Sequence, residues 1–306
     1  MTLVPDNFKT RVRELYGQAG EDWLQALPQV LDQCQRRFGI RFEGPFENLS
    51  WNLILKAKLN DETPVVFKLA VLKEEVSKEL RVLRAHAAHG AIRVIEADEN
   101  LGALVLERAE PGTPLSTIEN DDLATEIFTD VFRRLHGAPV NHDLYPSIKE
   151  HFKAIKRYYD RSGALQGPLP TYWVKRAMQT LQHLNSTTKE PVLLHGDLHH
   201  DNILRQGIGN WVVIDPKGIV GDPHFDAIQF LLNYEDRGSD VDTLLYRRIV
   251  IISKHLDLDP HRIAMWGVAR GILEACWILE NGGSNWSEGI RITERFAKCL
   301  DALGGP

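Results

Sequence analysis

The chain contains little cysteine, and its few cysteines are poorly placed to bond with one another. Among its 306 residues there are three cysteines, Cys34, Cys276 and Cys299, which lie far apart and form no CxxC pair. A disulfide framework usually uses an even set of cysteines, and a structural zinc site uses closely spaced ones. The cysteine pattern therefore indicates neither, and we interpret the three residues as reduced thiols in the core or on the surface.

The sequence also lacks long apolar runs and an excess of basic charge. No run reaches the roughly 18 apolar residues of a membrane span, and the N-terminal segment becomes polar and charged at once. The formal net charge of -6 provides no basic surface for a nucleic-acid backbone. We therefore expect a cytoplasmic globular protein that binds a small or cationic partner, and neither nucleic acid nor membrane. The sequence specifies no oligomeric state.

The hydrophobic pattern divides the chain into three parts. Residues 1–38 are expected to form two N-terminal helices. Residues 39–110 contain short β-rich runs in the order three strands, a helix that Gly90 is expected to end, and two strands. Residues 111–306 are chiefly helical, with short β-like pieces that indicate a hairpin. The pattern predicts an α+β fold with a small, mostly antiparallel β-rich N-lobe and a larger helical C-lobe.

One segment of the helical part concentrates polar side chains at the ends of apolar runs. It is VLLHGDLHHDNILRQGIGNWVVIDPKG, in which Asp197 and Asn202 follow the first run and Asp215 ends the second strand. A hairpin would bring Asp215 beside the loop that carries the other two. A carboxylate base, together with an amide oxygen and a carboxylate as ligands of Mg²⁺, is what phosphoryl transfer needs.

The same segment also resembles a zinc cluster at first sight. Residues 195–201, HGDLHHD, contain three histidines, His195, His199 and His200, together with Asp197 and Asp201. A catalytic zinc usually takes three ligands from differently placed elements, and no HxH or HExxH pair occurs elsewhere in the chain. Phosphoryl transfer is therefore the favoured interpretation. A metal-dependent hydrolase and a polar loop without a catalytic role are the alternatives.

The β-rich part contributes a lysine in an unusual setting. Lys68 lies in the apolar strand PVVFKLA, where an ammonium group is costly to bury without an anionic partner. Glu79 on the following helix can supply that partner, and Glu75, one turn earlier, is the alternative. A lysine held in this way can bind the phosphates of a nucleotide.

Two motifs together resemble the catalytic segment of the aminoglycoside phosphotransferases, which share the protein-kinase-like fold. They are HGDLHHDNIL and IDPKGIVGDPHFD, and the second is closest to the branch of streptomycin 6-kinases and hydroxyurea-type resistance kinases. Weaker similarity continues in GALVLERAEPGTPL, which is similar to the family's hinge, and in ARGILEACWILENG. The resemblance covers about residues 43–282, and it implies a two-lobe kinase-like fold whose N-lobe, residues 39–110, binds nucleotide.

The resemblance also implies roles for individual residues. Asp197 would act as the base or orient the acceptor hydroxyl, and Asn202 and Asp215 would bind Mg²⁺. Lys68, held by Glu79, would position the phosphates of ATP or GTP.

Further positions would support the site or contact the nucleotide base. His195 would brace the loop, and Asp226 would support it from the following helix, with substrate contact as the alternative for Asp226. The hinge, with Glu107 and Ala109, would offer backbone groups to the adenine.

The chain departs from the kinase pattern in the turn between its first two strands. That turn, GPFENLSWN, is not a GxGxxG loop, and no Walker A motif GxxxxGK[ST] occurs in the chain. Ser50 and the neighbouring amides are therefore candidates to cover the phosphates, although a turn without a ligand role is an equally open interpretation.

Acceptor recognition is expected in the C-terminal helices. A cationic acceptor would be attracted to an acidic, partly aromatic pocket, and Glu280 and Glu274 are the candidates. Each could instead be a solvated residue, and Trp277 is expected to pack in the core.

The sequence thus predicts a Mg²⁺-dependent small-molecule kinase that phosphorylates a hydroxyl of a streptomycin-type aminoglycoside with ATP or GTP. A kinase for another small metabolite, such as choline, a sugar amine or a hydroxyurea-like compound, is the alternative, as is a non-catalytic nucleotide-binding module. A protein kinase is disfavoured because no APE-like motif follows IDPKG.

Overall fold

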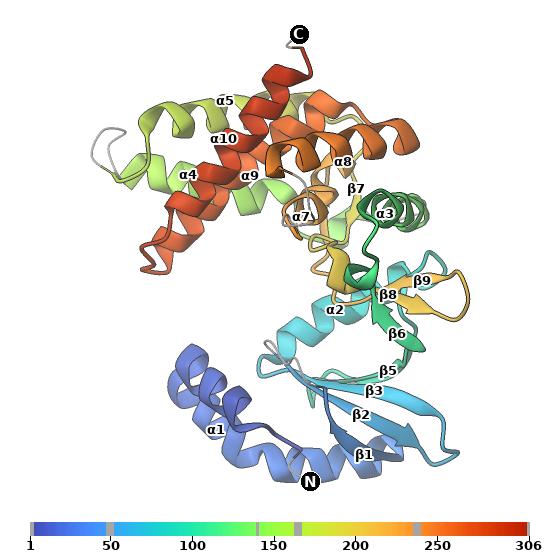
Figure 1. The fold of residues 1–306 in the computed structure, drawn as a ribbon. Helices are drawn as coiled ribbons and strands as arrows, with labels where there is room; N and C mark the ends of the chain where they lie inside the picture. The colour runs from blue at the N-terminus through green and yellow to red at the C-terminus, as the bar shows by residue number, and fades with distance from the viewer. Residues whose placement is uncertain (1–2, 47–51, 139–140, 162–166, 235–239, 305–306) are drawn as a thin grey trace. The chain divides into compact units, whose positions relative to one another are not determined.

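The computed structural model describes residues 3–46, 52–138, 141–161, 167–234 and 240–304 (Figure 1). The chain divides into two compact units, which we call the N-terminal unit (residues 1–113 and 204–215) and the C-terminal unit (114–203 and 216–306). The first boundary is close to the expected one after residue 110. Residues 204–215, in contrast, group with the N-terminal unit, although chain order placed them in the helical part. Local sequence pattern does not reveal that the chain returns to an earlier unit.

The N-terminal unit is built on a five-stranded antiparallel sheet with strand order β1-β2-β3-β5-β4. Helix α2 lies between β3 and β4 in the chain, which confirms the expected order of three strands, a helix and two strands. The helix ends five residues before Gly90, with His86 as its C-cap, so Gly90 is not its terminator. The elements are β1 (Ile40–Pro45), β2 (Leu53–Leu59), β3 (Pro64–Leu69), α2 (Lys73–Ala85), β4 (Val94–Asp98) and β5 (Ala103–Glu107).

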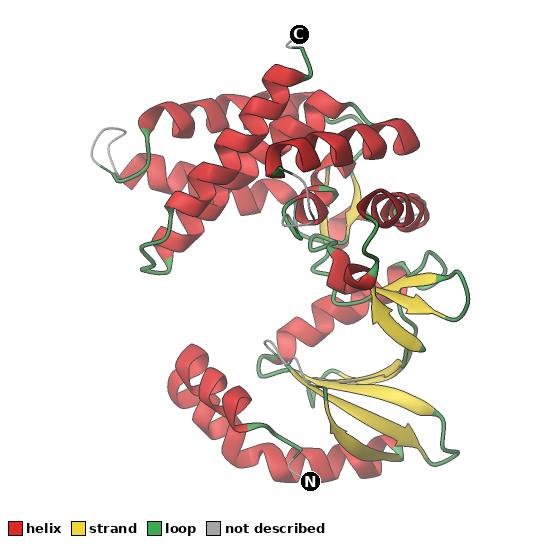
Figure 2. Cartoon of the chain, in the orientation of Figure 1, coloured by secondary structure: helices red, strands yellow, loops and turns green. Residues whose placement is uncertain are grey.

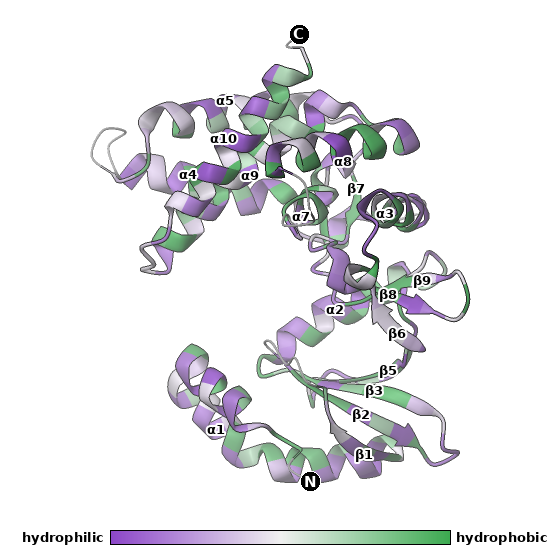
Figure 3. Cartoon of the chain, in the orientation of Figure 1, coloured by the Kyte–Doolittle hydropathy of each residue, from purple (hydrophilic) through white to green (hydrophobic). Residues whose placement is uncertain are grey.

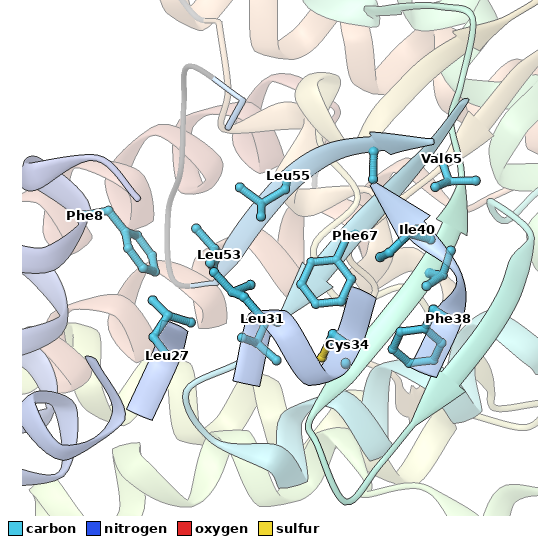
Figure 4. Close-up of a cluster of buried hydrophobic side chains, with 14 of the residues drawn as sticks. Phe8, Leu27, Leu31, Cys34, Phe38, Ile40, Leu53, Leu55, Val65 and Phe67 are labelled. Carbon is cyan, nitrogen blue, oxygen red and sulfur yellow. The ribbon is translucent and has the colours of Figure 1, made fainter. Parts of the chain in front are cut away.

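Helix α1 (Asp6–Phe38) covers one face of this sheet. Its helical geometry is interrupted at Gly17, where φ is 54° and ψ is -129°, so the two expected helices are joined directly at a glycine that tolerates this conformation. Figure 4 shows the shared core, in which side chains such as Phe8 and Leu31 of α1 pack with Leu53 and Phe67 of the strands. Figure 3 colours much of β3 and β5 as hydrophobic.

Strand alternation places Lys68 on the opposite face. Val65, Phe67 and Leu69 of β3 belong to the core beneath α1. Successive side chains of a strand point to opposite faces, so Lys68 points away from α1. Because β3 is the central strand of the sheet, Lys68 occupies no exposed edge.

A second, three-stranded sheet carries the expected hairpin. Its strand order is β6-β8-β9, where β6 spans Pro111–Pro114, β8 spans Ile203–Gln206 and β9 spans Trp211–Val213. Strand β6 lies inside the segment AEPGTPLS, which was interpreted as a connector. The amide of Ile92 donates to the carbonyl of Val213 at 2.9 Å, which ties the hairpin to the N-terminal unit.

The C-terminal unit is drawn in Figure 2 mainly as helices. Helix α9 is its centre and packs against α4, α5, α8 and α10. An added Cβ at Gly271 of α9 would lie 2.6 Å from the carbonyl oxygen of Gly289 in α10, so the two helices approach closely there. The helices are α3 (Asp121–Leu135), α4 (Ile148–Arg161), α5 (Thr171–Thr187), α6 (Pro223–Asp226), α7 (Ile228–Leu231), α8 (Val241–Leu256), α9 (Pro260–Glu280) and α10 (Ser287–Ala302).

A short antiparallel pair of strands, β7 (Val192–Leu194) and β10 (Ile219–Gly221), crosses this helical unit. Within the described part of the chain, no helix combines the length and the apolar character needed to cross a membrane. The observed architecture is α+β, with a small antiparallel sheet and a larger helical part, and it confirms the fold class expected from the pattern.

Candidate active site

A buried lysine lies between two carboxylates in the N-terminal unit. Lys68 Nζ is 2.6 Å from Glu79 Oε2 and 2.7 Å from Asp215 Oδ1. Lys68 is 4% exposed and Glu79 is 7% exposed. Burial acts to lower the pKa of Lys68, but the charges and hydrogen bonds of the two carboxylates outweigh it, and the net shift is upward. The expected ion pair with Glu79 is therefore present, and Lys68 is held as a cation.

Asp215 completes this cluster from the segment that follows β9. Its backbone has φ of 57°, in the left-handed region that aspartate enters more readily than most residues. Its side chain is 31% exposed, so a carboxylate is presented to solvent beside a fixed ammonium group.

The expected hinge lies at the end of β5. The amide of Glu107 donates to the carbonyl of Arg93 at 2.8 Å, and its side chain accepts a hydrogen bond from Gln206 at 3.1 Å. Ala109 follows, and its carbonyl oxygen would lie 2.6 Å from a Cβ at Gly112, which has φ of 69°. Contact of Glu107 and Ala109 with adenine stays a prediction. Ser50, the candidate for covering the phosphates, lies outside the described residues.

In the C-terminal unit, a loop of residues 195–202 follows β7. It is fixed first by the two residues just before β10, since the carbonyl of His195 accepts hydrogen bonds from the amides of Lys217 at 2.7 Å and Gly218 at 3.2 Å. The loop ends in a 3₁₀ turn that spans His200–Asn202. The backbone of this loop is thus positioned by the β7–β10 strand pair, in which β7 precedes the β8–β9 hairpin in the chain and β10 follows it.

Asp226 of α6 holds the beginning of the loop. Its carboxylate accepts hydrogen bonds from the amides of His195 and Gly196, each at 2.8 Å, and Nε2 of His136 lies 3.0 Å from Oδ2. Burial acts to raise the pKa of Asp226, but the His136 contact and the neighbouring charges and amide outweigh it and lower it. The supporting contacts expected of Asp226 are present. Whether they serve catalysis stays a prediction.

Asp197, the candidate base, is oriented by contacts to both carboxylate oxygens. Oδ1 accepts a hydrogen bond from Nε2 of Gln229 at 3.0 Å, and Oδ2 lies 4.0 Å from Nζ of Lys217. The amide of Asp197 donates to Nδ1 of His195 at 3.2 Å, and a bracing role of His195 stays a prediction. Nδ2 of Asn202 donates to the carbonyl of Asp197 at 2.9 Å.

The three histidines of the segment perform separate structural tasks. The ring of His195 accepts from the amide of Asp197, and the ring of His199 accepts from the amide of Asp201 at 3.3 Å. His200 is fully buried and stacks on Phe230 with 4.1 Å between ring centroids. Among the described residues, no group of three or more His, Cys, Asp and Glu side chains is arranged to hold a metal ion. The geometry gives the zinc interpretation no support.

Several positioning contacts were not anticipated from the sequence. Gln229 follows Asp226 by three residues, so helical spacing could have indicated that both face the loop. The contact of His136 with Asp226 joins residues 90 positions apart and has no local signal. Asp201 was considered only as a zinc ligand, yet it accepts hydrogen bonds from Ser116 and Tyr234, each at 2.6 Å.

The candidate acceptor residues both form ion pairs at the C-terminal end of α9. Glu280 makes two hydrogen bonds with Arg157, at 2.9 and 2.8 Å, which lower the pKa of Glu280. Glu274 accepts from Arg270 at 2.7 Å. Both glutamates are therefore partnered within the chain.

Glu274 lines a pocket of about 610 Å³. Trp277 lines the same pocket and is only partly buried, which corrects its expected place in the core. It lies near the end of α9, where one side of its ring is covered by the guanidinium group of Arg270, 5.1 Å from the ring centroid. The remaining lining residues are Ile278, Asn281 and Gly283.

The chain is similar to known proteins over most of its length. The model of the family described as aminoglycoside/hydroxyurea antibiotic resistance kinase matches residues 45–282. The streptomycin 6-kinase of Streptomyces griseus is 27% identical over 91% of this chain and 92% of its own length. The hydroxyurea phosphotransferase of Kitasatospora aureofaciens is 27% identical over 94% of this chain and 82% of its own length.

A solved structure shares the fold. It is a thermostable mutant of aminoglycoside phosphotransferase APH(4)-Ia in a ternary complex with ADP and hygromycin B. The likeness has a TM-score of 0.64 at 15% identity, and it covers 90% of this chain and 99% of that one. The expected kinase-like fold class is thereby confirmed.

Proposed function

Because the chain belongs to the aminoglycoside/hydroxyurea antibiotic resistance kinases, which are phosphotransferases, we propose that it transfers the γ-phosphoryl group of ATP or GTP to a hydroxyl of a streptomycin-type aminoglycoside. The observation that carries the proposal is the fixed orientation of Asp197. One of its oxygens is held by Gln229, and its backbone is held by a loop anchored on Asp226. Such a carboxylate suits the acceptance of a hydroxyl proton.

The second requirement is a set of groups that bind nucleotide phosphates. Lys68, fixed by Glu79 and Asp215, would contact the phosphates with an ammonium group that is already positioned. Catalysis in phosphoryl transfer is mostly positioning and charge stabilisation, so a rigid cation of this kind suits the task.

The residues also fit a magnesium ion. Because Nδ2 of Asn202 is used by the carbonyl of Asp197, Oδ1 is the other polar atom of that amide group. Oδ1 of Asn202 and the carboxylate of Asp215 are each hard oxygen ligands, and Mg²⁺ usually takes only one or two carboxylates together with substrate phosphates. When bound, the ion would neutralise charge on the phosphates.

The acceptor assignment rests on relatives and on one pocket. Streptomycin 6-kinase is the name of a relative that matches over most of both chains. The pocket beside Glu274 offers a carboxylate and the indole ring of Trp277, which together suit a cationic acceptor. A hydroxyurea-like acceptor is the second candidate, because a relative of similar identity carries that name.

The test is nucleotide consumption by the purified protein with Mg²⁺ and either ATP or GTP. Streptomycin, other aminoglycosides, hydroxyurea, choline and sugar amines would be compared, and product mass would identify the phosphorylated compound. Streptomycin-dependent turnover that disappears in Asp197→Ala, while nucleotide binding persists, is the expected result.

Two outcomes would contradict the proposal. Turnover of Asp197→Ala within a few fold of the unaltered protein would refute the role of Asp197. Turnover on another compound and not on streptomycin would refute the acceptor assignment and leave phosphoryl transfer in place. The variant Asp143→Ala, which removes an exposed carboxylate of the same unit, is the matched control.

A further inference from the structure

Lys217 is held beside the candidate base by its own backbone. Its amide donates to the carbonyl of His195 at 2.7 Å. Gly196 has φ of 82°, and a Cβ at Gly196 would lie 3.3 Å from Cβ of Lys217, so the two segments pass close to each other. The root of the lysine side chain is thus fixed relative to the loop that carries Asp197.

The ammonium group of Lys217 faces one particular oxygen of Asp197. Nζ lies 4.0 Å from Oδ2, whereas Oδ1 accepts the hydrogen bond from Gln229. The Lys217 side chain is 47% exposed, and an exposed ion pair at this distance contributes little to folding stability. The ion pair with Asp197 thus places a positive charge beside Oδ2 of the candidate base.

We propose that Lys217 is a further catalytic residue, which contacts the transferred phosphoryl group and stabilises its charge; this inference rests on the proposed function. An acceptor hydroxyl lies about 2.6–3.2 Å from its base, and its oxygen lies about 3–3.5 Å from the atom it attacks. The phosphorus atom is then at most about 7 Å from Oδ2 of Asp197. A half-exposed lysine whose Nζ lies 4.0 Å from the same oxygen can reach phosphoryl oxygens in that range.

The chemical step balances without any change in Lys217. A bond forms between the acceptor oxygen and the γ-phosphorus, and the bond from that phosphorus to the β,γ-bridging oxygen breaks, so that the nucleoside diphosphate leaves. The hydroxyl proton passes to Asp197. Lys217 keeps its proton throughout and donates hydrogen bonds to the phosphoryl oxygens, where a charged donor is stronger than a neutral one.

The test measures binding of a transition-state mimic and needs no acceptor. Calorimetry would compare Mg·ADP alone with Mg·ADP plus aluminium fluoride, which imitates the phosphoryl group in transfer. The variant Lys217→Met keeps an unbranched stem and removes the charge, while the backbone contact with His195 is unaffected. We expect it to weaken the fluoride complex at least tenfold and to change Mg·ADP affinity by less than about twofold, since the ammonium acts on the transferring group.

Two further variants separate catalysis from structure. Lys217→Arg should restore most of the affinity for the fluoride complex, because it restores a charged donor. Lys298→Met removes another exposed lysine of the same unit, which pairs with Asp242 at 3.1 Å, and should bind both complexes normally. In steady-state assays Lys217→Met should lower kcat about 100-fold with little change in KM for nucleotide.

Equal binding of the fluoride complex by Lys217→Met and the unaltered protein would overturn the inference. Failure of streptomycin to be phosphorylated would instead contradict only the acceptor assignment, because the fluoride complex contains no acceptor. Absence of binding of both Mg·ADP and Mg·GDP by the unaltered protein would contradict the proposed function and the inference together.

Discussion

Gln229 donates a hydrogen bond from Nε2 to Oδ1 of Asp197, with 3.0 Å between the two atoms. Gln229 lies in α7, directly after α6, and Asp226 of α6 accepts the amides of His195 and Gly196 at the start of the same loop. One short helical segment therefore fixes both the backbone and the side chain of the candidate base. This double anchoring places the carboxylate before any substrate binds, as preorganised catalysis requires.

Gln229→Leu removes the side-chain anchor and keeps the size of the residue. We expect kcat to fall about 10- to 100-fold, the equivalent of losing one hydrogen bond to a charged group. Nucleotide affinity should stay the same, because Gln229 contacts the candidate base. Steady-state kinetics with streptomycin would measure the change, with Gln18→Leu as control, since Gln18 pairs with Asp22 on the exposed surface of α1. Unchanged kcat in Gln229→Leu would show that Asp197 is oriented by other contacts.

Glu79→Gln removes one of the two anions that surround Lys68. Since Lys68 is buried and keeps Asp215 as a partner, we expect the free energy of unfolding to fall by about 1–3 kcal/mol. Urea denaturation measures this loss, and titration with Mg·ADP should also show weaker binding. Glu75→Gln, one helical turn earlier, is the matched control and should change neither quantity. Equal stability of the two variants would mean that Asp215 alone is enough to stabilise the buried charge of Lys68.

Much of the fold could be predicted because its determinants are local. Short β-rich runs between turns identified the strands, and helical spacing with Val76, Leu80 and Leu83 identified α2, in which all three side chains are buried. A lysine in an apolar strand required an anion, and the nearest helix offered Glu79. Each of these features could be predicted from residues that lie close together in the sequence.

The remaining features depend on contacts between distant residues. His136 reaches Asp226 across 90 residues, and Lys68 reaches Asp215 across 147. The C-terminal end of α2 differs from the expected one because the backbone of His86, and no glycine, caps it. Trp277 has the helical spacing of a core residue, and only the folded chain shows that the end of α9 leaves it partly exposed. No single stretch of sequence contains such information.

The free energy of unfolding should depend on pH in the acid range because of Asp226. Its pKa in the folded protein is lower than the ordinary value of about 3.9, so its contribution is complete above about pH 5 and is lost as pH falls through the folded-state pKa. Asp226→Asn keeps the size of the side chain but places an NH₂ group, which is a hydrogen-bond donor, against the two loop amides, which are also donors. The difference in unfolding free energy between Asp226→Asn and the unaltered protein should be constant in the acid range down to about pH 5 and narrow below about pH 4.

Chemical denaturation across pH would measure this difference. His136 contacts Asp226, so His136→Gln would be measured in parallel as the control for loss of that contact. A difference that grows on acidification would mean that the carboxylate is stabilised in its protonated form, contrary to the observed hydrogen bonds.

The two candidate acceptor residues should respond differently to loss of charge. Glu274 lines the pocket beside Trp277 and accepts from Arg270 through one oxygen, whereas Arg157 donates to both carboxylate oxygens of Glu280. A cationic acceptor would interact with Glu274 through a charge-assisted hydrogen bond, so Glu274→Gln should raise KM for streptomycin about tenfold or more with little change in kcat. Glu280→Gln, the same substitution six residues further along α9, should leave KM within about twofold, since Arg157 occupies both oxygens of that carboxylate. Kinetics at saturating nucleotide would measure both values. The reverse ranking would place the acceptor at the Arg157 side of α9 and not in the pocket beside Trp277.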